Sequence, residues 1–302
     1  MKISLKPIGV ILKRSFLKYR KDDPIKMAGT TAYFTIFAIA PILIIIISVF
    51  GLVLQEERIS GKIFEELEVL IGGEGTDFVR NLVTNFQSRE RNIAGTIIGF
   101  AIFIFTSTTF FSVLQNSLNY IWRVRAKPKN NLLRSLIDRL LSFGLILSIG
   151  FILVVSLVID ASLSFFRDFL ERYINDYTLF IIKPMNLVIS FVVITVVFAL
   201  IYRYLPDTKV KWKVVWVGAL STALLFFGGK YLIGWVLAST NLNAMYGAAG
   251  SVVIIVLWVF YSSIIFFFGA EITHQYAEYY NYRIAPKDYA IRIKIMDVEE
   301  QE

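Results

Sequence analysis

Long, uninterrupted apolar segments constrain this chain more than any other feature of its sequence. Several exceed the roughly 18 residues that separate a membrane-spanning helix from a buried helix of a soluble protein. The 302 residues are 56% hydrophobic and only 18% charged, whereas soluble proteins typically carry about 25% charged residues. The sequence therefore predicts an all-α, polytopic membrane protein. Because the apolar segments are continuous rather than alternating, an outer-membrane β-barrel is excluded.

The positions of the apolar segments predict six transmembrane helices. At about 1.5 Å per residue, each segment can cross a hydrocarbon core of roughly 30 Å with some tilt. The chain then divides into a basic N-terminal segment (1–27), a six-helix domain (28–273) and a C-terminal tail (274–302). The expected spans cover approximately residues 28–54, 93–116, 136–159, 180–204, 213–238 and 247–273.

The distribution of Lys and Arg predicts that both termini are cytoplasmic. Residues 1–27 contain eight basic residues, and the loop 117–135 contains five basic residues and no acid. The loop 55–92 instead contains eight acidic and five basic residues. Basic loops lie on the cytoplasmic side of membrane proteins. The net charge of +8 is then explained by contact with anionic lipid at the inner leaflet, and no nucleic-acid partner is needed.

Two segments outside the spans are expected to be amphipathic helices. Residues 7–21 are basic and carry an apolar stripe, as in helices that lie on a membrane surface. They serve either as an anchor or as a specific lipid or partner site. The loop 55–92 fits two helices, near 61–71 and 76–88, with a hinge or helix stop at Gly72–Gly75. We expect these two helices to form a cap over the outer surface. The stripe of the first segment consists of Ile8, Ile11, Leu12, Phe16 and Tyr19.

Lys230 is the strongest functional candidate within a span, because a charge at this depth costs at least about 2.5–3.5 kcal/mol. It lies about eight residues, or about 12 Å, from the outer end of the fifth span. Nearby Gly228, Gly229 and Gly234 would let another helix approach closely. Lys230 either lines an outward-facing cavity that binds a carboxylate or phosphate, or is a structural lysine that snorkels or pairs with Asp160.

A second group of charges is expected near the inner ends of the spans, where it would form either a gate or a structural clamp. Pro41 is expected to kink the first span, and the polar side chains of the second span, including Gln115 and Asn119, are expected to join helices. The group of charges consists of Glu271, Arg139, Arg203 and Asp138.

The sequence does not favour a cofactor, a metal or an enzymatic role. It contains no cysteine and one histidine, His274, which excludes iron–sulfur clusters and Cys-ligated zinc. We interpret His274 as an interfacial structural residue. Asp22 and Asp23 either bind a metal or end an N-terminal helix.

Three motifs are distinctive. The first spans Asp22-Asp23, Ala28, Ala32-Tyr33-Phe34 and Pro41, and the second is Pro206-Asp207 after the fourth span. Together with the six-span arrangement and the third motif, they resemble the YihY/BrkB family of bacterial inner-membrane proteins over essentially the whole chain. The third motif consists of Gly247-Ala248-Ala249-Gly250-Ser251, Leu257-Trp258, Tyr261-Ser262 and Gly269-Ala270-Glu271.

This resemblance implies a multi-pass location in the bacterial inner membrane. Some members of the family carry a ribonuclease BN label and others a serum-resistance or virulence label. Hydrolysis of RNA would need metal ligands or acid–base groups in water, and the matched motifs lie in or beside lipid, so we expect no ribonuclease. We expect a transporter or flippase of an amphiphilic, anionic envelope component. The alternative is a non-transporting scaffold or envelope-maintenance protein, and a homo-oligomer is compatible with either.

Overall fold

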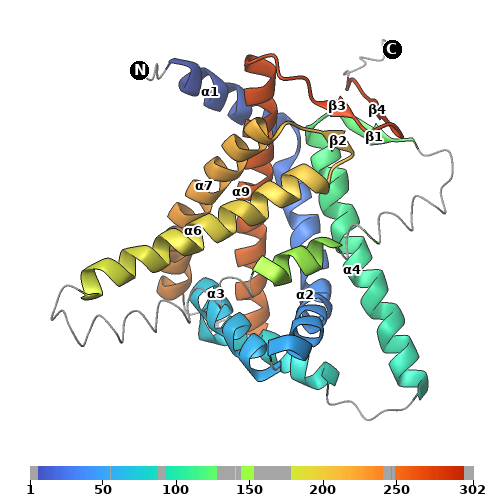
Figure 1. Ribbon diagram of the computed structural model, residues 1–302, viewed down its shortest axis with the longest axis vertical. Helices are drawn as coiled ribbons and strands as arrows, with labels where there is room; N and C mark the ends of the chain where they lie inside the picture. The colour runs from blue at the N-terminus through green and yellow to red at the C-terminus, as the bar shows by residue number, and fades with distance from the viewer. Residues whose placement is uncertain are drawn as a thin grey trace.

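A computed structural model describes residues 6–54, 56–87, 93–127, 140, 144–152, 178–240, 246 and 249–295. Figure 1 shows that this part of the chain is mostly helical, with four short strands at one end. The helices are α1 (Lys6–Lys21), α2 (Pro24–Leu54), α3 (Glu56–Gln87), α4 (Ile93–Ile121), α6 (Thr178–Tyr204), α7 (Trp212–Ser239) and α9 (Gly250–Tyr279). The strands are β1 (Val124–Ala126), β2 (Thr208–Lys209), β3 (Ala285–Pro286) and β4 (Ala290–Arg292).

Within the described residues, four helices are long and apolar enough to span a membrane. They confirm the first, fourth, fifth and sixth expected spans as apolar helices of sufficient length. The second expected span lies within the continuous helix α4, and residues 144–152 of the third are helical. The rest of the third span lies outside the described residues, so the number of six stays a prediction. The four segments are Pro24–Leu52, Leu187–Tyr204, Trp212–Val236 and Gly250–Tyr279.

Helix α9 lies at the centre of the fold and contacts α1, α2, α3, α4 and α7. Glycines allow it to approach α7 closely. A Cβ atom added to Gly269 would meet the side chain of Thr222 and would lie 2.7 Å from the hydroxyl of Tyr202. One added to Gly218 would meet Thr273. Small residues permit such close packing between helices in a membrane, where van der Waals contact drives association.

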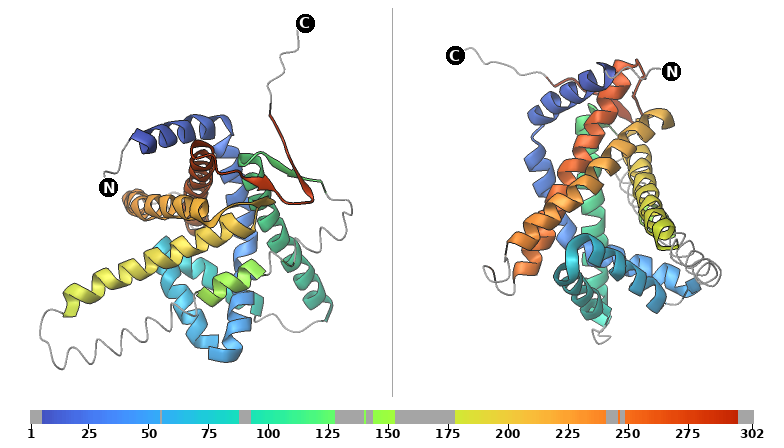
Figure 2. Two further views of the ribbon diagram at one scale, coloured as in Figure 1. Left: turned by 45° about the horizontal axis from the view of Figure 1, so that its top comes forward. Right: turned by 90° about the vertical axis from the view of Figure 1, so that its left-hand side faces the viewer.

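The helices converge at the end of the molecule that carries α1 and the four strands, and they spread apart toward α3 (Figures 1 and 2). The first and last described elements, α1 and β4, lie at this converged end. That placement is consistent with both termini on one side of the membrane, although the cytoplasmic assignment of that side stays a prediction from the basic loops.

Two small antiparallel sheets fasten the converged end. Strand β1 pairs with β4 in the register Val124↔Arg292, and β2 pairs with β3 in the register Thr208↔Pro286. The segment after α9 therefore returns to the loops that follow α4 and α6. The sequence did not indicate these strands, because each has only two or three residues and its partner lies about 80 or more residues away.

Helix α3 contains the expected hinge. Gly72 has φ 77° and ψ 169°, which divides α3 into two helices. This conformation is essentially restricted to glycine, so the prediction of a break at Gly72–Gly75 is confirmed. Residues on both sides of the hinge are buried against the bundle, and α3 contacts α2 and α9. These residues are Ile59, Ile63, Phe64, Ile71, Val79 and Val83.

The apolar stripe expected on helix α1 is partly buried and partly exposed. Ile11 and Tyr19 are buried, whereas Leu12 and Phe16 are 44% and 60% exposed. The Tyr19 hydroxyl donates a hydrogen bond to the Ile264 carbonyl of α9, at 2.8 Å. Burial raises the pKa of the Tyr19 phenol, so the hydroxyl remains a donor. One seam of α1 therefore packs on α9, and the other apolar residues stay exposed.

Candidate functional site

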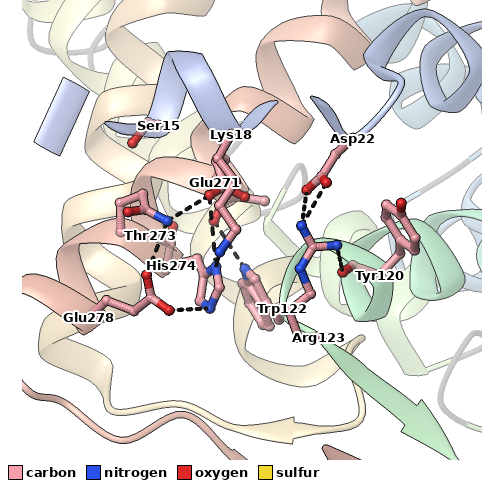
Figure 3. A network of polar contacts seen from close by, with 12 residues as sticks. Ser15, Lys18, Asp22, Tyr120, Trp122, Arg123, Glu271, Thr273, His274 and Glu278 are labelled. Carbon is pink, nitrogen blue, oxygen red and sulfur yellow. Dashed lines mark hydrogen bonds and ion pairs between the residues drawn. The ribbon is translucent and has the colours of Figure 1, made fainter. Parts of the chain in front are cut away.

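A network of polar side chains joins α1, the end of α4 and α9 at the converged end (Figure 3). Lys18 comes from α1, and Asp22 comes from the corner between α1 and α2. Trp122 and Arg123 follow α4, and Glu271, His274 and Glu278 lie on α9. The Trp122 indole donates a hydrogen bond to the Ala270 carbonyl at 3.0 Å. These contacts join four segments: α1, the α1–α2 corner, the residues that follow α4 and the last turns of α9.

Asp22 and Arg123 form the shortest ion pair of this network. Nη2 of Arg123 lies 2.6 Å from Oδ1 and 2.9 Å from Oδ2 of Asp22. The guanidinium also donates to the Tyr120 carbonyl at 3.2 Å and lies 5.1 Å from the Tyr120 ring centroid. Burial alone would lower the pKa of Arg123, but the hydrogen bond and charge of Asp22 prevail and raise that pKa. Asp22 is therefore a salt-bridge residue at the helix corner.

The neighbouring Asp23 adopts the left-handed conformation, with φ 50°. Its carbonyl accepts a hydrogen bond from the Met27 amide at 3.2 Å, at the start of α2. Within the described residues, no group of three or more His, Asp or Glu side chains could hold a metal ion. Helix α1 ends at Lys21, directly before Asp22 and Asp23, which fits the expectation that these residues end an N-terminal helix.

Glu271 is fully buried, and its contacts are unequal. Oε1 accepts a hydrogen bond from Nε2 of Gln275 at 2.9 Å. Within the described part of the chain, Oε2 has no hydrogen-bond partner. The charge of Arg123 acts on Glu271 electrostatically. Glu271 is thus a buried carboxyl group that depends on one amide and on nearby positive charge.

His274 connects this carboxyl group to α1. Its Nδ1 lies 3.4 Å from Nζ of Lys18 and 3.8 Å from Oε1 of Glu271. Because an ammonium can only donate, a hydrogen bond between Lys18 and His274 requires the tautomer in which Nδ1 accepts and Nε2 carries the proton. Nε2 lies 3.6 Å from Oε1 of Glu278. In this tautomer, His274 binds Lys18 and faces Glu278, and its contact with Glu271 is not a hydrogen bond.

Asp207, from the Pro206-Asp207 motif, forms a second polar centre at the converged end. Its carboxylate accepts hydrogen bonds from Gln115 (3.1 Å), Asn119 (2.8 Å) and Tyr289 (3.1 Å). Its amide donates to Oδ1 of Asn119 at 2.8 Å, and its carbonyl accepts from the Lys287 amide at 2.9 Å. The motif therefore holds α4, the α6–α7 connection and the segment after α9 together.

Lys230 lies in the half of α7 that points away from this converged end. It is half-buried, and the acid that acts on it electrostatically is Glu66 of α3. Glu66 also forms an ion pair with Lys62, with an Nζ–Oε1 distance of 3.1 Å. Of the three nearby glycines, only Gly229 meets another helix, where a Cβ atom would meet the Tyr261 phenol. Asp160, the partner considered from the sequence, lies outside the described residues.

The expected inner group of charges is only partly described. Asp138 and Arg139 lie outside the described residues. Arg203 lies 5.6 Å from the Trp212 ring centroid, whereas the contacts of Glu271 are with Gln275 and His274. The basic residues connected with Glu271 are instead Lys18, which contacts His274, and Arg123, which interacts with Glu271 through its charge. Neither was predicted, because a basic residue outside a span is common and nothing local indicates a buried partner.

The remaining motif residues are mainly packing residues. Tyr33 is 58% exposed and makes edge contacts with Phe34 and Phe37. Pro41 is buried inside α2, which continues through it. Gly247 lies outside the described residues, and Gly250 and Ser251 begin α9.

Trp258, Tyr261 and Gly269 lie where α9 meets α7. The Trp258 ring contacts Phe226 edge-on at 5.5 Å. Tyr261 packs against Gly229, and Gly269 packs against Thr222. The third motif therefore specifies the contact between α7 and α9, and it places Glu271 at the converged end of the molecule.

Comparison with known proteins places this chain in a family. The sequence model of the family described as "Virulence factor BrkB" matches residues 15–292. The chain belongs to this family. As a BrkB-family protein with several long apolar helices, it is a multi-pass protein of the bacterial inner membrane. No solved structure matches it.

Relatives of this BrkB-family chain are called UPF0761 membrane proteins. The one from Haemophilus influenzae, UPF0761 membrane protein NTHI0384, is 25% identical over 89% of this chain and 95% of its own length. The one from Azotobacter vinelandii is 30% identical over 85% of this chain, and the one from Saccharophagus degradans is 25% identical over 92%. The chain spans only 60% and 63% of these last two relatives.

Proposed function

We propose that this BrkB-family protein transports or flips an amphiphilic, anionic envelope component across the inner membrane. Lys230 is the cation that binds the charged headgroup. The observation that carries this proposal is the position of Lys230, which is half-buried in an apolar helix and is influenced by the charge of Glu66 in the amphipathic helix α3. An ionisable residue within a span is by default a candidate for a substrate pathway.

Helix α3 supplies the means to admit a substrate. Glu66 acts on Lys230 only through its charge, and its ion-pair partner is Lys62. A phosphate or carboxylate can therefore bind Lys230 without breaking the Lys62–Glu66 ion pair. The break at Gly72 lies in the same helix, and in this proposal it is the point at which the two halves of α3 change their relative angle when a substrate enters.

In this proposal, the converged end closes the side of the protein that lies opposite α3. The Asp22–Arg123 pair, the Trp122 indole and the group around Glu271 join four segments there, whereas the helices spread apart toward α3 (Figure 1). In this proposal, the substrate reaches Lys230 from the α3 side. Release on the other side then requires the contacts at the converged end to open.

A scaffold or envelope-maintenance role is the second candidate. It is favoured by the complementary groups around Asp22 and Asp207, and by Glu66 opposite Lys230. In that case, Lys230 only holds α3 against the bundle. We do not propose ribonuclease activity: His274 contacts Lys18, and Asp22 binds Arg123, so both side chains already have internal partners.

Reconstitution into liposomes tests the proposal. Purified protein is incorporated with a trace of fluorescent phosphatidylglycerol or phosphatidylcholine, and transbilayer movement is measured by chemical quenching of the outer leaflet. The variants are Lys230→Ala, Lys230→Arg and Tyr231→Ala. Tyr231 adjoins Lys230 but is 70% exposed, so its variant controls for truncation of this part of α7.

We expect the wild type to accelerate movement of the anionic probe. Lys230→Ala should slow this movement at least tenfold, Lys230→Arg should retain much of it, and Tyr231→Ala should resemble the wild type. Equal rates for wild type and Lys230→Ala would remove Lys230 from the mechanism. If the protein moves no probe faster than protein-free liposomes do, the scaffold role is favoured.

A further inference from the structure

A cluster of cations and aromatic rings lies where α6 ends and α7 begins. The Arg203 guanidinium lies 5.6 Å from the Trp212 ring centroid. The ammonium groups of Lys211 and Lys213 lie 5.5 and 5.9 Å from the ring centroid of Tyr282. We refer to these five residues as the α6–α7 patch. Contact with an aromatic face orients a cation without neutralising its charge.

The α6–α7 patch has an excess of positive charge. In the described residues, none of its three cations forms an ion pair with a carboxylate. The nearby acid Asp288 is bound by Lys209, with an Nζ–Oδ1 distance of 2.7 Å. Arg123, by contrast, has a buried carboxylate of its own. Since no described residue neutralises these cations, the patch can bind an anion from outside the chain.

The position of the patch identifies that anion. Two apolar segments, Leu187–Tyr204 and Trp212–Val236, end and begin beside it, so it lies at a membrane boundary. Trp212 and Tyr204 are 40% and 48% exposed, and Trp and Tyr are enriched at this depth of a bilayer. The anions concentrated there are lipid headgroups, which bind basic residues between transmembrane helices.

An exposed apolar stripe continues from the patch along α7. Trp212, Trp216, Leu220 and Leu224 follow one another at intervals of four residues, which places them on one side of the helix. All four are exposed, by 40%, 40%, 43% and 64%. The patch and the stripe together present a positive site for a headgroup and, directly below it, a surface for an acyl chain.

We propose that the α6–α7 patch binds the phosphate of an anionic phospholipid. The acyl chain of this lipid lies along the exposed stripe of α7, over Trp216, Leu220 and Leu224. This lipid is a structural partner and does not depend on transport through Lys230, which lies in the opposite half of α7. The inference also gives Arg203 a role at the lipid surface rather than in a gate with Glu271.

Lipid binding to the detergent-purified, full-length protein tests this proposal. Native mass spectrometry and thermal unfolding are measured with added phosphatidylglycerol, phosphatidylcholine or inorganic phosphate. One variant combines Arg203→Gln, Lys211→Gln and Lys213→Gln. The matched control combines Arg125→Gln, Lys127→Gln and Lys294→Gln, which are exposed residues near the same end. Both variants lose the same formal charge.

We expect phosphatidylglycerol, but not phosphatidylcholine, to bind the wild type and raise its unfolding temperature. The patch variant should bind phosphatidylglycerol about a hundredfold more weakly, because three cations near a membrane surface are lost. The control variant should bind like the wild type. Equal weakening in both variants would show non-specific attraction and overturn the site. A stabilisation of equal size by inorganic phosphate alone would overturn the assignment to a lipid.

Discussion

The Asp22–Arg123 pair should be a main determinant of stability at the converged end. The side chains of Asp22 and Arg123 are 4% and 17% exposed. Removal of one partner from a buried ion pair typically costs about 3–5 kcal/mol, because the remaining charge is left without compensation. Arg123 retains the Tyr120 carbonyl and some solvent contact, so we expect the low end of this range, about 3 kcal/mol, for Asp22→Asn.

The matched control for this change is the next residue. Asp23→Asn makes the same chemical substitution one position away, at an exposed side chain whose left-handed backbone asparagine tolerates. It should change the free energy of unfolding by at most about 0.5 kcal/mol. A loss of about 3 kcal/mol in Asp22→Asn corresponds to a fall in unfolding temperature of roughly 6–12 °C, if this protein resembles soluble chains of similar size.

A double-mutant cycle separates the pair from the individual residues. Asp22→Asn, Arg123→Gln and the double variant are compared with the wild type, because the double variant leaves neither charge alone. We expect its cost to be smaller than the sum of the single costs by about 1–3 kcal/mol. Arg123→Lys should be intermediate, since lysine keeps the charge but loses the planar contact with Tyr120.

Intrinsic tryptophan fluorescence is a suitable assay. Thiol-reactive dyes are excluded because the chain has no cysteine. The five tryptophans report on unfolding of the whole chain, and one of them, Trp122, directly precedes Arg123. Unfolding in detergent is followed on heating, with circular dichroism as a second probe of helix content. Equal shifts for Asp22→Asn and Asp23→Asn, or additive costs in the cycle, would refute the conclusion that the pair stabilises the fold.

Three further predictions use the same unfolding assay. Gly229→Ala should destabilise the protein by about 1–3 kcal/mol, because its Cβ would meet the Tyr261 ring; Gly228→Ala, where a Cβ has open space, should be neutral or slightly stabilising. Asp207→Ala should cost about 2–6 kcal/mol, because the two buried side-chain amides that donate to it lose their acceptor. Gly72→Ala should cost about 1–3 kcal/mol, because the hinge has φ 77° and ψ 169°. No measurable change in any one of these variants would contradict the contact on which it rests.

The sequence predicted those parts of the fold that depend on local composition. Four apolar segments became helices of the expected position because lipid leaves the backbone no partner other than its own. The break in α3 was predictable because three glycines lie close together at Gly72–Gly75. The short sheets at the converged end were not, since β1 and β4 are too short to carry a pattern and are joined only by tertiary contacts.

The candidate site shows the same division. Lys230 and Glu271 could be selected from the sequence because a charge within an apolar segment is unusual. Asp22 and Arg123 could not be paired, because each lies in a polar stretch where charges are common and 101 residues separate them. The burial that distinguishes Asp22 from the exposed Asp23 arises only when α4 ends beside the α1–α2 corner.

Substitutions at the two ends of the molecule should therefore have different effects on transport and on the unfolding temperature. At the converged end, Asp22 and Arg123 satisfy each other, so their loss should lower the unfolding temperature whether or not the protein transports anything. Lys230 is half-buried and senses the charge of Glu66, whose ion-pair partner is Lys62, so its loss leaves Glu66 with a partner and should cost little stability. If transport falls in Lys230→Ala while the unfolding temperature is unchanged, the lysine acts on a substrate. If both fall together, it acts as a structural contact for α3, and the scaffold role gains the support that transport loses.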